Sequence, residues 1–465
     1  MKLRNTILIG TLIRICLMPF FAHPFDVYAW YTVCVSIIKN GPLVIAYPLP
    51  MMFYTLIPIA YTYNLASTLI PMTPIPMEEI PAELNYFLRY KTLYDVKYVP
   101  GMLFNTIVKV PFIVSDIIIA ILIYKIVEAL TEKEGLAEKA SAIWLLNPYV
   151  IFISSGWGMF DSLPALFCTA SLYLLMKKKI RPAAVCLGVA AAYKLYPIVF
   201  LIPVLFYFTK TNQKNGRRDG LSFLLTFLST SALLFLPFAN RVLQTSMDLV
   251  SNTGGGPFAF GLTYWSISLA LPLDANVSAF LSSALVVAFL AIVYWRTSKL
   301  TFEKPFIDLA ASMLACILAI FLSYRIICEQ YLVWALPFII ILCIEKRVEE
   351  ALYRSLSLTA LAYAVTYTWI PYFLLATTPW TGDILIAMVR LVYLFRKTRP
   401  DPTAPFTPSM SPGPILYTIL GTAFSILALI MLTETLFKPR EKLMKKLMPT
   451  WLDRILCKLR IQTAD

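Results

Sequence analysis

Charged residues are scarce in this sequence. They make up 14% of its 465 positions, whereas a soluble globular domain carries about a quarter. Hydrophobic residues make up 59% of the chain, and the mean hydropathy is +0.73. Apolar runs of about 20 residues recur between short polar loops, which is the pattern of transmembrane helices and not of β-barrel strands. The composition therefore excludes a soluble domain and predicts an all-α polytopic membrane protein.

Histidine and paired cysteines are scarce too. His23 is the one histidine in the sequence, which excludes a histidine-rich metal site, and we expect it to be an interfacial residue. The eight cysteines lie mostly inside apolar runs and show no Cys-x-x-Cys spacing. They therefore indicate neither a zinc site nor a disulfide framework. The first apolar run, residues 5–21, is not followed by a small-residue cleavage site, and we expect a retained helix.

The net charge is +14, and the basic residues gather in alternate loops. These loops are residues 177–181, 210–218, 296–304, 346–347 and 396–399. Lysine and arginine accumulate in this way in the cytoplasmic loops of membrane proteins. The basic charge is therefore a topology signal, and no nucleic-acid partner is expected.

With the basic loops placed in the cytoplasm, the chain is expected to cross the membrane about 13 times. The expected spans are residues 5–21, 107–127, 140–153, 163–176, 182–193, 197–208, 221–238, 279–294, 307–322, 331–344, 356–376, 384–395 and 415–432. Two large outer loops carrying short interfacial helices are expected at residues 22–105 and 239–276. The first belongs to an N-terminal module, residues 1–238, and the second precedes a C-terminal helix module, residues 277–437.

Two segments do not fit this count. Residues 47–70 are long enough to span, but a full crossing would put every basic loop outside, so we interpret them as re-entrant or interfacial. The tail, residues 438–465, is basic and has the pattern of an amphipathic helix at the membrane surface. Counting spans places this tail outside. Either residues 415–432 do not cross fully, or the count is wrong by one helix.

Polar residues gather at the expected outer ends of the spans. They include Asp26, Asp161, Lys194, Arg325 and Glu329. A carboxylate at the edge of a membrane segment is costly to desolvate and is usually solvated, paired or functional. Because these residues fall on one expected face, they suggest an enzyme site there.

Four stretches of sequence carry a family resemblance. They are Phe25-Asp-Val-Tyr-Ala-Trp30 with Tyr47-Pro-Leu-Pro50, Leu145-Leu-Asn-Pro148 with Gly156-Trp-Gly-Met-Phe-Asp161, Ala192-Tyr-Lys-Leu-Tyr-Pro197, and Ser323-Tyr-Arg-Ile-Ile-Cys-Glu-Gln-Tyr-Leu-Val-Trp-Ala-Leu-Pro337. In this order they resemble GT-C superfamily glycosyltransferases, and within them the mannosyltransferases related to the enzyme that adds the first mannose of the GPI anchor. This chain departs from that enzyme in its first outer loop, where it has the single aspartate Asp26 in place of an Asp-x-Asp pair. The difference argues against a two-carboxylate or metal-dependent site.

The resemblance implies a GT-C fold and inverting transfer of a hexose, mannose above all, from a polyprenyl (dolichyl) phosphate sugar to a lipid-linked or extracytoplasmic glycan acceptor. Because the phosphate is already a good leaving group, the reaction needs one base for the acceptor proton and cations for the phosphate. Asp26 is the expected base, and Lys194 and Arg325 are the expected donor phosphate ligands. Substrate-binding roles are expected for Tyr47, Asp161, Tyr196, Glu329, Gln330 and Tyr331.

The resemblance implies few other components. No cofactor is indicated, although a divalent cation stays open as an alternative. The expected partners are the donor, the acceptor and membrane lipids. The expected location is a cell membrane or an ER-type membrane, with the active site on the non-cytoplasmic face.

Simpler roles compete for the same residues. Asp26 and Asp161 could cap helices, Lys194 could extend from a span end to the interface, and Arg325 could pair with Glu329 four residues later. Two other function classes also stay open. A transporter or flippase of lipid-linked sugars would be expected to contain internal repeats, and no convincing repeat is seen. A non-catalytic assembly subunit is the third class, and release of sugar from a polyprenyl-phosphate donor is expected of the glycosyltransferase alone.

Overall fold

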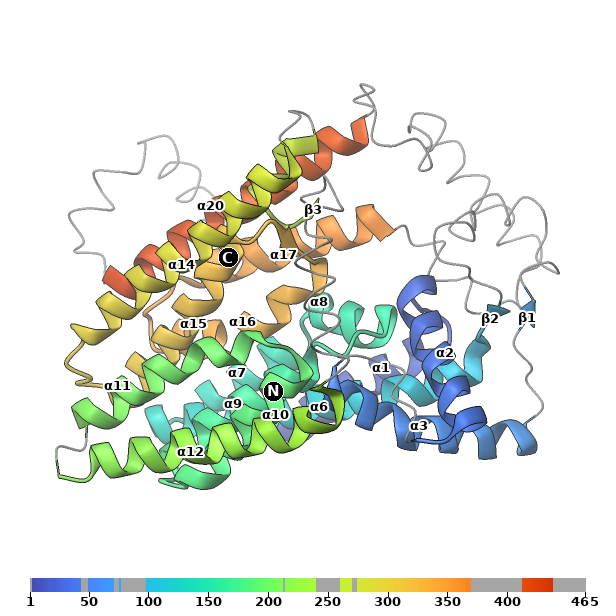
Figure 1. Cartoon of the computed structure of the whole chain (residues 1–465), viewed down its shortest axis with the longest axis horizontal. Coiled ribbons are helices and arrows are strands. Elements are labelled where there is room, and N and C mark those ends of the chain that lie inside the picture. The colour runs from blue at the N-terminus through green and yellow to red at the C-terminus, as the bar shows by residue number, and fades with distance from the viewer. Residues whose placement is uncertain are drawn as a thin grey trace.

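The computed structural model describes residues 2–42, 49–70, 75–76, 98–211, 214–239, 260–269, 274–368 and 412–437, and most of them lie in helices (Figure 1). Two pairs of two-residue strands complete the described elements. β1 (Ile75–Pro76) pairs antiparallel with β2 (Tyr98–Val99), and β3 (Phe260–Gly261) pairs in parallel with β4 (Ile326–Ile327). The all-α architecture expected from the composition is confirmed.

The helices before residue 240 are α1 (Leu3–Leu17), α2 (Pro24–Asn40), α3 (Pro50–Leu69), α6 (Gly101–Thr131), α7 (Glu134–Leu145), α8 (Pro148–Ile151), the π-helical turn η2 (Phe152–Trp157), α9 (Ser162–Met176), α10 (Ile180–Tyr193), η3 (Tyr196–Phe200), α11 (Leu201–Thr211), α12 (Gly216–Phe235) and η4 (Leu236–Phe238). The later helices are η5 (Tyr264–Leu269), α14 (Ala275–Ser298), α15 (Pro305–Ser323), η6 (Glu329–Tyr331), α16 (Leu332–Ile344), α17 (Glu350–Thr368) and α20 (Pro412–Phe437).

Five helices of the described part are long and apolar enough to cross a membrane: Gly101–Thr131, Gly216–Phe238, Asn276–Ser298, Pro305–Ser323 and Leu416–Phe437. A sixth crossing results if α7 and the segment Pro148–Trp157, which meet at a bend of 44°, form one span. The chain is therefore an integral membrane protein, as its composition predicts.

The expected count of about 13 spans is not confirmed. Four expected spans correspond to shorter apolar helices, Ser162–Met176, Ile180–Tyr193, Tyr196–Thr211 and Glu329–Ile344. At about 1.5 Å per residue such helices reach ~21–24 Å, less than the ~30 Å of a hydrocarbon core. The first expected span corresponds to α1, which has 15 residues. Helix α3 covers much of residues 47–70, the stretch interpreted as re-entrant, and is not among the five helices long and apolar enough to cross. The expected span at residues 384–395 lies outside the described part of the chain.

Helix α15 lies at the centre of the later helices, where it packs against α11, α14, α16 and α20. Most of its apolar stretch, 83%, is buried, against 17% in α12 and in α14. In Figure 1, α14 and α20 run side by side along one edge of the molecule. Leu233 on α12 and Phe280 on α14 leave more than two thirds of their surface exposed. Because lipid chains are as apolar as these side chains, the helix faces that carry them suit a bilayer.

Basic loops meet at one end of these helices. Arg347 forms an ion pair with Asp308 at the start of α15. Arg296, near the end of α14, donates through Nε to the carbonyl oxygen of Leu436 at 3.1 Å. Helix α20 thus ends beside the basic loops, which are expected to be cytoplasmic. Counting the expected spans had placed the tail that follows this helix on the non-cytoplasmic side.

Candidate active site

Asp26 lies in the first turn of α2, whose N-cap residue is His23. Its carboxylate oxygen Oδ2 is 2.9 Å from Nδ1 of His23 and accepts a hydrogen bond from Nε1 of Trp157 at 2.6 Å. The ring of His23 stacks on Trp157, with centroids 4.6 Å apart. Two side chains, themselves in contact, therefore hold one oxygen of Asp26.

The contacts of Asp26 keep it ionised. Burial raises the pKa of this carboxyl, but the charge of His23, hydrogen bonds from His23 and Trp157, and the charge of Lys194 together lower the pKa below its ordinary value. The Asp26 side chain keeps 20% of its surface exposed. It is thus a charged proton acceptor that a substrate can reach.

His23 can hold its proton in two ways. Its Nδ1 also lies 3.3 Å from the backbone nitrogen of Asp26. Nδ1 donates to the carboxylate only when it carries a proton, and it accepts from the backbone N–H only when it does not. The shorter of the two contacts is the one to the carboxylate, so the proton on Nδ1 is the arrangement that the geometry favours.

Trp157 reaches Asp26 because the chain turns sharply after it. Gly158 has φ +88°, a conformation that favours glycine. A Cβ at Gly158 would lie 3.0 Å from side-chain atoms of both Lys109 and Val27. The turn therefore packs closely against α6 and α2, and it ends the π-helical turn with its indole directed to Asp26.

Lys109 ties this turn to the end of α1. The side chain is fully buried, and its Nζ donates to the carbonyl oxygens of Met18 and Ser155 at 2.9 Å and to that of Phe21. Three carbonyl groups, from the segment before His23 and the segment before Trp157, are thus bound to one ammonium group. Lys109 is a structural residue that fixes the entry to the site.

Asp161 precedes α9, yet its side chain does not cap that helix. Its Oδ1 is 2.8 Å from Nζ of Lys194 and accepts a hydrogen bond from Nε1 of Trp334 at 2.6 Å. The side chain of Asp161 is fully buried and that of Lys194 is 13% exposed. Because the ammonium group points inward to this carboxylate, Lys194 does not extend to the interface.

Aromatic rings surround Lys194. Its Nζ lies 4.5 Å from the ring centroid of Tyr331 and 5.0 Å from those of Phe160 and Trp334. Cations are attracted to ring faces at such distances. Trp334 also stacks on Tyr331 at 4.0 Å and on Tyr196 at 4.2 Å. Two of the expected substrate-binding tyrosines therefore form the wall beside the ion pair.

Glu329 and Gln330 are buried next to this wall. The hydroxyl group of Tyr149 donates to the carbonyl oxygen of Glu329 at 2.5 Å. Burial raises the pKa of the Glu329 carboxyl to about 7. Within the described residues, Glu329 Oε1, Gln330 Oε1 and Asp161 Oδ2 are buried without a hydrogen-bond partner. Three acceptor oxygens are thus available to hydroxyl groups.

The charged residues act on one another across the site. The charge of Lys194 lowers the pKa values of Asp26 and Asp161, and the charge of Asp26 raises those of Asp161 and Glu329. Lys194 and Asp161 are in direct contact at 2.8 Å, and Asp26 and Glu329 lie within range of their charges. Residues separated by more than 300 positions of sequence are therefore brought into one cluster.

Arg325 contacts a different helix. Its backbone N–H donates to Oγ of Ser282 at 3.1 Å, and its guanidinium donates to Oγ of Ser278 at 3.2 Å, both on α14. Among the ion pairs of the described residues there is none between Arg325 and Glu329. The alternative of an i,i+4 pair is thus not seen. Tyr47, also expected at the site, lies outside the described residues.

Sequence reasoning missed the indole and imidazole partners of the two aspartates. Trp157 and Trp334 both stand in the stretches that carry the family resemblance, and a buried indole N–H usually requires an acceptor. His23 lies three residues before Asp26, a spacing that puts two side chains on one helical face. Lys109 is a cation inside an apolar span, and an ionisable residue in that position usually has a partner inside the protein. The sequence could therefore have indicated its structural role.

No metal centre is evident in the part of the chain that the structure describes. Across those residues, no group of three or more histidine, cysteine, aspartate or glutamate side chains is arranged to hold a metal ion. The site consists of carboxylates, one amide, two cations and aromatic rings, a set that suits a polar ligand with hydroxyl and phosphate groups.

Comparison with known proteins gives a family and several relatives. The family model described as GPI transamidase subunit PIG-U matches residues 88–376, more than half of the chain. This range includes Asp161, Lys194, Arg325 and Glu329, and begins after Asp26.

The relatives are GPI mannosyltransferases. GPI mannosyltransferase 1 of Saccharomyces cerevisiae is 27% identical over 272 residues, which are 54% of this chain and 64% of the relative. The catalytic subunit of GPI alpha-1,4-mannosyltransferase I of Danio rerio is 26% identical over 354 residues, 70% and 83% of the two chains. GPI mannosyltransferase 1 of Dictyostelium discoideum is 34% identical over 124 residues, 26% and 27% of the two chains. The chain thus spans less than two thirds of the yeast relative's length, and the resemblance noted in the sequence is confirmed.

Proposed function

The chain belongs to the PIG-U family, and from this membership and the geometry of the site we propose that it is an integral-membrane mannosyltransferase. Its donor is a polyprenyl-phosphate mannose, and its acceptor is a lipid-linked or extracytoplasmic glycan. Relatives that are named as GPI mannosyltransferases support the sugar and the reaction class. The names alone do not identify the acceptor of this chain.

The observation that carries the proposal is the state of Asp26. His23 and Trp157 both contact Oδ2, which leaves Oδ1 as the oxygen for an incoming proton. An ionised carboxylate with one oxygen held in place and the other without these contacts can accept a proton, as a general base does. Its pKa lies below the ordinary value, so the base is charged at every physiological pH.

The proposed reaction is a single displacement. Asp26 takes the proton of the acceptor hydroxyl as its oxygen attacks the anomeric carbon from the face opposite the phosphate. A new carbon–oxygen bond forms, the bond to the phosphate oxygen breaks, and the phosphate leaves with the electron pair. The configuration at the anomeric carbon is therefore inverted. Because the leaving group is a phosphate, no general acid is needed.

Donor binding is assigned to the two cations. Arg325 offers a planar guanidinium that suits phosphate oxygens, and its backbone is held by α14. Lys194 is paired with Asp161, and its charge is proposed to be shared between that carboxylate and the phosphate. In this proposal both cations stabilise the negative charge of the leaving group.

Sugar hydroxyl groups are assigned to the unpaired acceptor oxygens. Asp161 Oδ2, Glu329 Oε1 and Gln330 Oε1 are buried without partners in the described part of the chain. A buried acceptor without a donor costs free energy, so such groups usually await a ligand or water. Tyr196, Tyr331 and Trp334 add ring faces on which a sugar can stack.

A second function has one specific observation in its favour. The family model that matches this chain is described as a subunit of GPI transamidase, which favours a non-catalytic role in an enzyme assembly. In that case Asp26 would have no reacting partner, and its loss would leave the assembly intact.

Sugar transfer by the purified protein tests the proposal. The full chain in detergent is incubated with polyprenyl-phosphate mannose labelled in the sugar and with a membrane lipid extract as acceptor. We expect labelled glycolipid and free polyprenyl phosphate, and in Asp26→Asn a loss on the order of 10²–10⁴-fold. The amide keeps the shape of the side chain but cannot take a proton.

The control is Asp219→Asn, the same chemical change in the first turn of α12, where the basic loop ends. Its activity is expected to equal that of the wild type. Retention of more than about a tenth of the activity in Asp26→Asn would exclude Asp26 as the base. No transfer by the folded wild type with any polyprenyl-phosphate hexose would favour the subunit function.

A further inference from the structure

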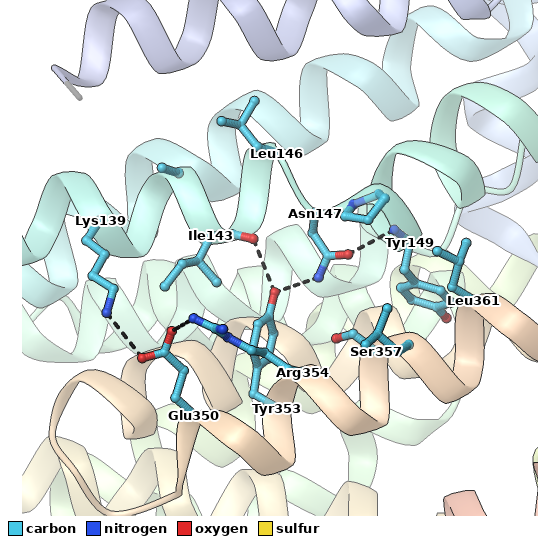
Figure 2. A pocket seen from close by; sticks show the side chains of 13 residues that line it. Lys139, Ile143, Leu146, Asn147, Tyr149, Glu350, Tyr353, Arg354, Ser357 and Leu361 are labelled. Atoms are coloured by element: carbon cyan, nitrogen blue, oxygen red, sulfur yellow. Dashed lines mark hydrogen bonds and ion pairs between the residues drawn. The ribbon is translucent and has the colours of Figure 1, made fainter. Parts of the chain in front are cut away.

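A groove of about 510 Å³ lies outside the active site, between α7 and α8 on one side and α17 on the other (Figure 2). Volumes of this order accommodate small-molecule ligands. None of the residues to which the reaction was assigned lines it. The groove is therefore a separate site, and its two ends differ in character.

One end of the groove carries three charges. Nζ of Lys139 is 3.2 Å from Oε2 of Glu350, and Nη2 of Arg354 is 2.8 Å from Oε1 of the same carboxylate. Figure 2 shows these side chains together at one end. One carboxylate is shared by two cations, so this end has a net charge of one positive unit. Both cations are more than half exposed and can bind a further anion.

The wall beyond these charges is apolar. The apolar lining residues are Ile143 on α7, Leu146 at the end of that helix, and Leu358 and Leu361 on α17. Leu358 leaves 61% of its surface exposed. From Arg354 to Leu361 the helix rises about 10 Å. The groove thus offers a positive end and an apolar length, which matches an amphiphile with one anionic end.

Two polar side chains inside the groove, Tyr353 and Asn147, are bonded to each other and to the backbone, whereas Ser357 Oγ is buried without a partner in the described part of the chain. The hydroxyl of Tyr353 accepts from Nδ2 of Asn147 at 2.6 Å and donates to the carbonyl oxygen of Ile143 at 3.2 Å. Asn147 accepts in turn from the backbone N–H of Tyr149. This network joins α7 and α8 to α17. Lys139 and Arg354 are the exposed cations of the groove and can bind an anionic group.

The far end is closed by Tyr149, whose ring lines the groove while its hydroxyl bonds the carbonyl oxygen of Glu329. A ligand in the groove therefore contacts the back of the active-site wall without entering the site. The ligand is not positioned to meet Asp26 or the ion pair of Lys194.

We propose that this groove binds a lipid of the surrounding bilayer, with its anionic phosphate headgroup at Lys139 and Arg354 and an acyl chain along Leu146, Leu358 and Leu361. A soluble anion would use the charged end but leave the apolar wall without a contact. A zwitterionic lipid would bring a second positive charge to two cations. An anionic phospholipid satisfies both ends.

Native mass spectrometry of the full chain, purified and washed free of lipid, tests the proposal. The protein is titrated with phosphatidylglycerol, with phosphatidylcholine and with inorganic phosphate. We expect the wild type to retain phosphatidylglycerol at least about tenfold more tightly than phosphatidylcholine. Each basic residue near an anionic lipid contributes roughly a fivefold gain, so Lys139→Gln with Arg354→Gln should weaken binding about 25-fold.

Two further variants separate the headgroup from the chain. Lys304 pairs with Glu345 at 3.2 Å, as Lys139 pairs with Glu350, and is more exposed than Lys139. Lys304→Gln therefore removes a comparable cation outside the groove and should leave lipid binding unchanged. Ala142→Phe fills the apolar part of the groove and should weaken both lipids. Thermal unfolding of each variant checks that the chain remains folded.

Three outcomes would overturn the proposal. Equal binding of phosphatidylglycerol by the wild type and the double variant would exclude headgroup recognition by Lys139 and Arg354. Displacement of the lipid by inorganic phosphate at equal molar concentration would identify a site for a soluble anion. Displacement of phosphatidylglycerol from the wild type by undecaprenyl phosphate at equal molar concentration would assign the groove to the donor.

Discussion

Lys194 is a single charged residue whose charge is compensated inside the protein. It is paired with the fully buried Asp161 at 2.8 Å. Removing one partner of a buried ion pair leaves the other charge uncompensated, which typically costs about 3–5 kcal/mol. Substitution of Lys194 should therefore lower stability as well as donor binding.

Arg325→Gln and Lys194→Gln are expected to weaken binding of the polyprenyl-phosphate sugar roughly ten- to hundredfold, because each removes a charge-assisted hydrogen bond to phosphate. Acceptor binding should stay unchanged. Isothermal titration with each substrate separately measures both affinities. Lys194→Gln should also unfold at a lower temperature, and adding Asp161→Asn should restore part of that loss. Equal losses for donor and acceptor would indicate structural damage.

Glu329 should make stability depend on pH near neutrality. Burial raises its pKa to about 7, so between about pH 4.5 and 7 the folded protein holds a proton that the unfolded chain has released. Stability therefore falls as pH rises through this window, by on the order of 3 kcal/mol from this group. The effect is fully present above pH 7 and absent below about pH 4.5.

Thermal unfolding of the wild type and of Glu329→Gln at pH 5 and pH 8 measures this dependence. The variant should gain stability relative to the wild type on going to the higher pH, because its amide does not ionise. Parallel pH profiles for the two proteins would show that Glu329 does not titrate in this range.

The two-residue strands β3 and β4 hold the segment that carries Arg325 and Glu329 in position. β4 pairs in parallel with β3, and Leu262 continues the contact through a 2.7 Å hydrogen bond from its N–H to the carbonyl oxygen of Ile327. Gly261 has φ +95°, and a Cβ there would lie 1.9 Å from the same oxygen. The approach of these two segments therefore depends on a residue without a side chain.

Gly261→Ala is expected to separate β3 from β4 and to lower the unfolding temperature, since both the positive φ and the close contact become unfavourable. The conformational strain alone is on the order of 1–3 kcal/mol. Donor affinity should fall as well, because Arg325 directly precedes β4. Gly135→Ala in the first turn of α7, where a Cβ meets nothing within 4 Å, is the control and should be neutral or slightly stabilising. Equal unfolding temperatures for the two variants would contradict this account of β3 and β4.

At the scale of the whole molecule, the chemistry and the basic charge lie at opposite ends of the helices. Glu329 begins η6, which leads into α16 at the active-site end. Arg347 follows α16 and pairs with Asp308 at the other end. By the positive-inside rule the basic end is cytoplasmic. We therefore propose that the active site faces the non-cytoplasmic side, where a lipid-linked donor is accessible.

Cysteine labelling in a background without the native thiols tests this orientation. Cysteine at Asn40, exposed at the end of α2, should react with an impermeant maleimide in intact cells. Cysteine at Lys299, exposed between α14 and α15, should react only after permeabilisation. The reverse pattern would place the active site in the cytoplasm and remove the reason for a lipid-linked donor.

The helix pattern shows where sequence reasoning reaches its limit. Apolar runs located most helices, because hydrophobic content is a local property that a bilayer selects. Whether a run crosses fully depends on its length and on the elements beside it, as α9 and α10 illustrate. Both are apolar, but each is shorter than the hydrocarbon core of a bilayer. Helix α9 begins directly after Asp161, and α10 ends directly before Lys194.

The sequence by itself determined that this is an all-α membrane protein and that Asp26, Asp161, Lys194 and Glu329 stand at the ends of apolar segments. Charge scarcity and run length suffice for both, because each is a local consequence of the cost of placing polar groups in lipid. Only the tertiary structure decided which groups touch. Trp157 donates to Asp26 across 131 positions and Trp334 to Asp161 across 173, and such partners depend on how the helices pack and not on any local pattern.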